Sequence, residues 1–217
     1  MQAAVIFDMD GLLVDSEPLW KEAADVLLGK YGIKLSLEEY EKTTGLRTRE
    51  FLDWWFRTYN LPLENIPSAE KEIVELVIEK VHEKGKAMPG VEYILRFFKE
   101  RNFRIGLASS SPMYMIENVI RFLGIENAFD AITSAGDLAY GKPHPEVYLN
   151  CANALGVVPT QCLCFEDSFN GMIAAKAAKM KCVVVPAQHQ QQMARWAAAD
   201  LKIAALSNFN QLLLNTI

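Results

Sequence analysis

An apolar run that ends in two carboxylates constrains this chain more than any other feature. Residues 3–7 read Ala-Ala-Val-Ile-Phe, which is typical of a strand buried on both faces, and Asp8 and Asp10 follow at once, with Gly11 behind them. Two carboxylates two residues apart repel each other, and burial disfavours their ionised form further. A cation, a proton or a transferred group is therefore expected beside them.

Strand-like and helix-like patterns alternate along most of the chain. Strands are predicted at 3–8, 103–109, 131–134, 161–166 and 182–186, with a sixth candidate at 201–204, and helices at 90–100, 112–123, 145–155 and 170–179. This alternation predicts an α/β fold with a doubly wound, Rossmann-like parallel sheet. Ligands of such sheets bind at the carboxyl ends of the strands.

The interval 16–86 interrupts the alternation, because it shows helical patterns and no convincing strand. Its first predicted helix has apolar residues at helical spacing, namely Leu19, Ala23, Val26 and Leu27. We predict a catalytic core of residues 1–15 and 87–217 with an inserted α-helical cap at 16–86. The chain leaves the core after Asp15 and returns near Met88, which is expected of a lid on a hinge.

Polar side chains follow the other predicted strands. Three serines, Ser109 to Ser111, end the second strand and open a helix whose free N–H groups favour an anion. Glu166 and Asp167 end the fourth strand, and Lys142 lies in a loop stiffened by prolines just before a helix. Carboxylates suit Mg²⁺, which takes one or two of them together with phosphate oxygens and water.

Four motifs in this order resemble the haloacid dehalogenase superfamily, in its group with a helical cap. They are Asp8-Met-Asp-Gly-Leu-Leu-Val-Asp-Ser-Glu-Pro, Gly106-Leu-Ala-Ser, Gly141-Lys-Pro-His-Pro and Phe165-Glu-Asp-Ser-x-Asn-Gly. Within that superfamily the chain resembles the β-phosphoglucomutase-like subgroup, and most of all its hexitol phosphatase and 2-deoxyglucose-6-phosphate phosphatase branch. The resemblance implies a Mg²⁺-dependent phosphatase of hexose or hexitol monophosphates that works through an aspartyl-phosphate.

The resemblance also implies roles for individual residues. Asp8 would be the nucleophile and a metal ligand, and Asp10 would act as acid and base while its main-chain carbonyl contacts the metal. Asp167 would be a metal ligand, and Glu166 either a ligand or an outer-shell charge. Ser109, with Ser110, Ser111 and the neighbouring N–H groups, would hold the phosphoryl oxygens, and Lys142 would balance their charge.

Substrate choice is expected in the cap. Arg47 is predicted to hold a substrate hydroxyl or phosphate, with Arg49 as the alternative, and Trp20 is predicted to lie against the substrate near the hinge. An aromatic cluster in the same segment is interpreted as the core of the cap rather than as a surface that stacks on sugars; it comprises Phe51, Trp54, Trp55, Phe56 and Tyr59.

Two other functions remain open from the sequence. One is a mutase of the β-phosphoglucomutase kind, although those enzymes carry a histidine where this chain has Trp20. The other is a receiver-like signalling module, which also gathers aspartates and a lysine at strand ends but is shorter and has no inserted cap. Product analysis distinguishes the mutase from a phosphatase, because a mutase yields an isomeric sugar phosphate and a phosphatase yields free phosphate. Stable phosphorylation of the protein without turnover would identify the receiver-like module.

Composition bounds the setting of this chemistry. A net charge of -5 and a pI near 5.3 argue against a nucleic-acid partner, which would need clustered basic residues. No apolar run approaches the roughly 20 residues of a membrane span, and no basic leader precedes Asp8, so we expect a cytoplasmic protein.

The four cysteines lack a zinc-site spacing and are interpreted as reduced thiols. The expected partner is a small phosphate ester, and the expected state is a monomer.

Overall fold

The computed structural model describes residues 3–217 and contains one parallel sheet of six strands in the order β3-β2-β1-β4-β5-β6. The strands are β1 (Ala4–Phe7), β2 (Arg104–Ser109), β3 (Ala131–Ser134), β4 (Cys162–Glu166), β5 (Lys181–Val184) and β6 (Leu201–Lys202). The predicted α/β fold is confirmed, and each predicted strand lies within two residues of its observed bounds. β1 is central, between β2 and β4, so the residues that follow it lie in the middle of one sheet edge.

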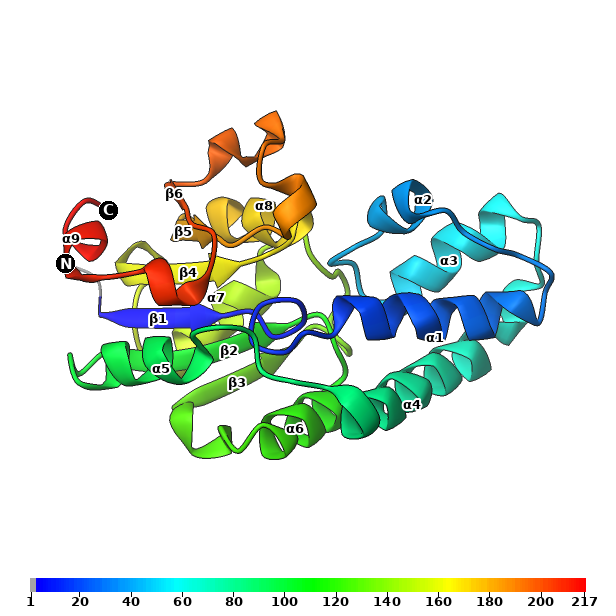
Figure 1. The fold of residues 1–217 in the computed structure, drawn as a ribbon, viewed down its shortest axis with the longest axis horizontal. Helices are drawn as coiled ribbons and strands as arrows, with labels where there is room; N and C mark the ends of the chain where they lie inside the picture. The colour runs from blue at the N-terminus through cyan, green and yellow to red at the C-terminus, as the bar shows by residue number, and fades with distance from the viewer. Residues whose placement is uncertain (1–2) are drawn as a thin grey trace.

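Helices cover both faces of the sheet (Figure 1). The flanking helices are α5 (Val91–Lys99), α6 (Met113–Phe122), α7 (Glu146–Ala154) and α8 (Phe169–Ala177), and the short α9 (Gln211–Leu214) lies near the C-terminus. Val5 and Phe7 of β1 belong to the apolar cluster that includes α5 and α6, whereas Ala4 and Ile6 belong to the cluster that includes α7 and α8. Every side chain of β1 is therefore buried, as the continuous apolar run predicts.

Four further helices form a separate lobe beyond the carboxyl end of the sheet, away from both termini (Figure 1). They are α1 (Glu17–Gly29), α2 (Leu37–Glu41), α3 (Thr48–Thr58) and α4 (Ile66–Lys84). Phe51, Trp55 and Phe56 are buried in this lobe, whereas Trp54 and Tyr59 are exposed. Val26 is 47% exposed, so the predicted apolar stripe of α1 is wrong at that position; Ala24 and Leu28 are buried on the helix instead.

The two connections between the lobe and the sheet lie side by side. The Asp15 amide donates to the Lys86 carbonyl at 3.0 Å, and the Met88 amide donates to the Leu13 carbonyl at 2.9 Å. An ion pair of 3.1 Å joins the side chains of Asp15 and Lys86. Because both crossings are paired with each other, the lobe is attached at one narrow place.

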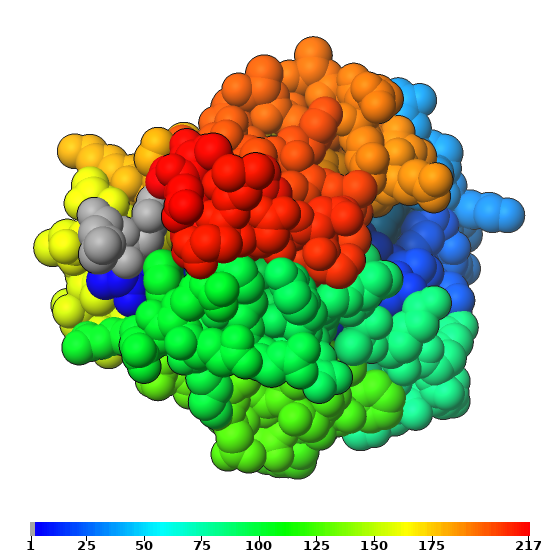
Figure 2. All heavy atoms as spheres, turned by 60° about the vertical axis from the view of Figure 1, so that its left-hand side comes forward, coloured from blue at the N-terminus to red at the C-terminus, as the bar shows by residue number. Residues whose placement is uncertain are grey.

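The C-terminal residues pack over the opposite end of the molecule, beside α5 (Figure 2). The Tyr93 hydroxyl donates to the Phe209 carbonyl at 2.8 Å, and the Phe209 ring packs against those of Phe98 and Phe165. All four cysteines are buried and free. Within residues 3–217, no helix is both long and apolar enough to cross a membrane.

Candidate active site

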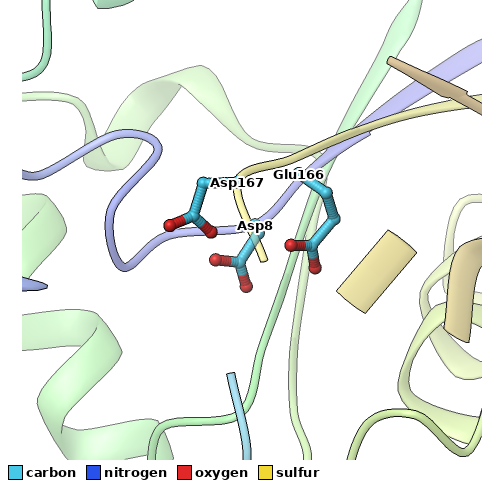
Figure 3. Close-up of side chains that lie close together, drawn as sticks. All are labelled: Asp8, Glu166 and Asp167. Carbon is cyan, nitrogen blue, oxygen red and sulfur yellow. The ribbon is translucent and has the colours of Figure 1, made fainter. Parts of the chain in front are cut away.

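Three carboxylates meet where β1 and β4 end. Asp8 follows β1, Glu166 is the last residue of β4, and Asp167 comes next (Figure 3). Each offers one oxygen, and these three oxygens lie within 4.8 Å of one another. Asp8 is 6% exposed and Glu166 is fully buried, so their mutual repulsion is little screened by water.

Lys142 reaches the same place from the loop before α7. Its Nζ donates to Asp8 Oδ1 at 2.5 Å, to Glu166 Oε1 at 2.6 Å and to the Ala108 carbonyl at 3.1 Å. Burial acts to lower the pKa of Lys142, but the charges of Asp8 and Glu166 outweigh it and raise that pKa above its ordinary value. The lysine is therefore a fixed positive charge against Asp8.

Both oxygens of Glu166 are held by the protein. Oε1 accepts from Lys142 and from the Tyr148 hydroxyl at 2.5 Å, and Oε2 accepts from the Ser168 amide at 3.2 Å and the Ser168 hydroxyl at 3.0 Å. A Cβ on Gly171 would lie 1.8 Å from Glu166 Oε1, so only glycine admits the carboxylate there. This bonding favours the outer-shell role among the two considered for Glu166. The roles of Tyr148 and Ser168 were missed in the sequence, because tyrosine and serine are common in loops and helices.

Asp10 lies beside Asp8 but has a different set of partners. Its Oδ1 accepts from the Ser16 hydroxyl at 2.7 Å and the Trp20 indole N–H at 2.9 Å, and its Oδ2 accepts from the Ser111 hydroxyl at 2.7 Å. Trp20 thus contacts the carboxylate predicted to be the acid and base. Ser16 is a further contact of Asp10, and no role was predicted for it. Both residues come from the start of α1, so the helical lobe helps to orient Asp10.

The three serines after β2 have separate partners. Ser109 Oγ accepts the Ser111 amide at 3.0 Å, while the Ser110 hydroxyl donates to the Gly45 carbonyl in the helical lobe at 3.0 Å. The helix they were predicted to open begins slightly later, at Met113. All three serines still line the cavity that contains Asp8.

The cavity lies between the sheet edge and the helical lobe. Its lining includes four carboxylates, Asp8, Asp10, Glu17 and Asp167, and Lys142 is the only lysine or arginine of residues 3–217 that lines it. Burial, reinforced by the charges of Asp10 and Asp8, raises the pKa of Glu17 to about 8. Glu17 was missed in the sequence, since nothing separates it from an ordinary first-turn glutamate.

The carboxylates of this cavity carry more negative charge than Lys142 can compensate. Burial raises the pKa of Asp8 to about 7, with Lys142 acting against the shift and Glu166 and Asp10 adding to it. Burial and the charges of Asp8 and Glu166 raise the pKa of Asp167 well above its ordinary value. Among residues 3–217, no hydrogen bond or ion pair is found to the Asp167 carboxylate. These oxygens fit a divalent cation, which would stabilise their ionised forms.

Mg²⁺ should therefore stabilise the protein more at high pH than at low pH. The pKa of Asp8 near 7 exceeds the 3.8 of an ordinary aspartate, so without metal its contribution to stability is present below pH 4 and is lost as the pH rises through 7. At a Mg²⁺ concentration of 100 Kd, binding adds about 2.7 kcal/mol to the free energy of unfolding. Thermal unfolding with and without Mg²⁺ at pH 5 and pH 8 measures this difference, and Asp167→Asn should remove it. Equal shifts at the two pH values would contradict the assignment.

The structure does not bring Arg47 into this cavity. Its guanidinium donates to the Leu138 carbonyl at 2.5 Å and to Glu50 Oε1 at 2.7 Å. Arg49 is exposed and lines a separate groove that also contains Trp54. The expectation that Arg47 contacts the substrate therefore lacks geometric support, because the guanidinium hydrogen-bonds to the core loop that contains Leu138 and to Glu50.

The chain resembles known proteins along most of its length. A family model described as haloacid dehalogenase-like hydrolase matches residues 2–179. Hexitol phosphatase B of Escherichia coli is 43% identical over 211 residues, which cover 94% of this chain and 92% of that protein. A phosphorylated carbohydrates phosphatase of Thermotoga maritima is 34% identical, with 81% of each chain covered.

A solved structure gives the same result for the fold. The crystal structure of β-phosphoglucomutase from Clostridium difficile matches with a TM-score of 0.86 at 28% identity, and the match covers 99% of this chain and 96% of that one. The residues matched by the family model include the motifs that carry Asp8, Lys142 and Asp167. This chain belongs to the haloacid dehalogenase-like hydrolases.

Proposed function

We propose that the protein is a Mg²⁺-dependent phosphatase of hexose or hexitol monophosphates with Asp8 as its nucleophile. One observation carries the proposal: the Asp8 carboxylate lies in the cavity with one oxygen bound by Lys142, while Asp10 and Ser109 line the same space. The phosphatase relatives from Escherichia coli and Thermotoga maritima support the reaction class and the kind of substrate.

The reaction proceeds in two displacements at phosphorus. Lys142 holds Oδ1 of Asp8, so Oδ2 is the oxygen free to attack, and the phosphorus–oxygen bond to the alcohol breaks as the aspartyl-phosphate forms. Asp10 gives its proton to the leaving alkoxide. Asp10 then takes a proton from the water that attacks the aspartyl-phosphate, which releases inorganic phosphate and restores Asp8.

The cation would be held by the side chains of Asp8 and Asp167 and the main-chain carbonyl of Asp10. Glu166 acts from the outer shell, since its own oxygens hold Lys142, Tyr148 and Ser168. When bound, Mg²⁺ neutralises negative charge on the phosphoryl oxygens. Lys142 contributes to the same neutralisation from the protein side.

Asp10→Asn should slow phosphate release by about 10²- to 10⁴-fold, because an amide cannot transfer the proton. Mg²⁺ binding should persist, since the main-chain carbonyl is unchanged. Steady-state rates and the Mg²⁺-induced shift of the unfolding temperature measure the two effects. A variant that bound Mg²⁺ more weakly, but reached the wild-type rate once Mg²⁺ was saturating, would show that the Asp10 side chain is a metal ligand and not the acid.

We propose that residues 16–86 act as a cap that selects the alcohol part of the ester. The cap side of the cavity carries the polar side chains of Glu17 and Tyr40, which suit hydroxyl groups, beside the rings of Trp20 and Phe51. The cavity is built from one chain, which is compatible with action as a monomer, and a sugar phosphate substrate is compatible with the predicted cytoplasmic location.

Product analysis tests the reaction class. The protein is incubated with Mg²⁺ and a panel of sugar, polyol, nucleotide and short acid phosphates, and both free phosphate and isomeric esters are measured. We expect free phosphate, with hexose or hexitol esters preferred. The similarity to a β-phosphoglucomutase structure makes the mutase the second candidate, and an isomeric sugar phosphate without phosphate release would establish it. Phosphorylated protein without turnover would instead indicate the receiver-like module.

A further inference from the structure

Arg47 and Glu50, at the start of α3 in the helical lobe, dock on the core loop that leads to Lys142. Arg47 Nη1 donates to the carbonyls of Ala135 at 3.3 Å and Leu138 at 2.5 Å, and Nη2 donates to the carbonyl of Ala139 at 3.3 Å. Residues 135–141 connect β3 to Lys142. One guanidinium thus fixes three main-chain groups of this short loop.

Glu50 joins this arginine to the residue before Lys142. Its Oε1 accepts from Arg47 Nη2 at 2.7 Å and from the Gly141 amide at 3.1 Å, and its Oε2 accepts the Arg47 amide at 3.2 Å. Arg47 is 9% exposed, and among residues 3–217 its Nε has no hydrogen-bond partner, so this buried guanidinium depends on the contacts of Nη1 and Nη2. If the lobe moved away from the core, the hydrogen bonds of Arg47 and Glu50 to residues 135–141 would all break at once.

The close approach depends on the absence of a side chain at Gly141. A Cβ there would lie 2.6 Å from Arg47 Cγ and 2.6 Å from Glu50 Oε2. Both distances are shorter than a van der Waals contact, so either both side chains or the loop itself would have to move. Gly141 therefore offers a way to disturb the contact from the core side without touching the lobe.

We propose that Arg47 and Glu50 act as a positioning clasp, which fixes the main chain before Lys142 when the helical lobe lies on the core. In that arrangement Lys142 Nζ reaches Asp8, so closure of the lobe and placement of the lysine become one event. Arg47 is then a positioning residue and not a substrate ligand. The inference rests on the proposed phosphatase function.

Activity measurements separate the clasp from a substrate contact. Arg47→Ala and Gly141→Ala should each lower kcat by about 10- to 100-fold, as expected when a group of the site is misplaced. The loss should be equal for a hexitol phosphate and for p-nitrophenyl phosphate, because Lys142 acts on the phosphoryl group common to both. Arg47→Lys should retain part of the rate. Arg57→Ala is the control, since Arg57 is 63% exposed on α3 and, among residues 3–217, pairs only with Asp53.

Amide hydrogen exchange gives a readout that does not depend on activity. Exchange in residues 135–142 should become faster in Arg47→Ala and Gly141→Ala and stay unchanged in Arg57→Ala, with thermal unfolding confirming that each variant is folded. Unchanged exchange, or a raised KM for the hexitol phosphate alone, would overturn the clasp and support a substrate contact. If wild-type protein hydrolyses no ester, the proposed function fails, whereas the exchange experiment still decides whether the clasp orders the loop.

Discussion

Replacing Asp8 by asparagine should lower phosphate release by at least about 10⁴-fold, because the reaction loses the oxygen that attacks phosphorus. An amide oxygen is a poor nucleophile, and it cannot supply the negative charge that a cation and Lys142 stabilise. The size of Asn matches that of Asp, so the cavity keeps its shape. Phosphate release from a hexitol phosphate under saturating Mg²⁺ measures the effect.

The Asp8→Asn protein should remain folded. Burial already raises the pKa of Asp8 to about 7, so the substitution also removes the free-energy cost of burying this charge. Lys142 keeps Glu166 as its partner. Asp53→Asn is the matched control, because Asp53 lies on the lobe surface and pairs with Arg57. It should leave the rate unchanged. A wild-type rate in Asp8→Asn would place the nucleophile elsewhere.

Lys142→Met should be the second most damaging change, and it should affect stability as well as rate. Lys142 is 2% exposed and is the cation that Asp8 and Glu166 share. Its removal leaves buried carboxylates unpaired, which typically costs about 3–5 kcal/mol. The loss should be larger at pH 8 than at pH 5, because Asp8, whose pKa burial raises to about 7, takes up a proton at pH 5 and loses its charge. Urea unfolding at the two pH values measures it.

A double variant separates the two effects of Lys142. Adding Glu166→Gln to Lys142→Met removes one of the unpaired charges, so much of the lost stability at pH 8 should return. The rate should not return, because no positive charge is left beside Asp8 and the phosphoryl group. Recovery of the rate together with stability would show that Lys142 serves the fold alone.

The fold could be read from the sequence because its signals are local. β1 is a continuous apolar run, and the helices on the sheet faces carry apolar residues every three or four positions, so burial and periodicity agree. Val26 shows the limit of this reasoning: spacing places it on the apolar side of α1, but the packing of α1 against α4 decides which residues are buried, and that packing is not local.

The site could be predicted only as far as strand ends indicate it. Parallel strands deliver their final residues to one edge, which is why Asp8, Glu166 and Asp167 could be expected to converge, and the loop between β3 and α7 brings Lys142 to the same edge. The partners of Asp10 could not, because Ser16 and Trp20 are brought to it by the angle at which α1 leaves the hinge. The contacts of Arg47 depend on how the lobe sits on the core, which no local pattern encodes.

Trapping of the covalent intermediate tests the central claim most directly. Protein mixed with a hexitol phosphate and Mg²⁺ is quenched in acid during turnover, digested and analysed by mass spectrometry. The account predicts one phosphoryl group on the peptide that contains Asp8, and none in the Asp8→Asn protein. Phosphate release by an enzyme whose only phosphorylated residue lies elsewhere, or a phosphoryl group that persists in Asp8→Asn, would contradict it.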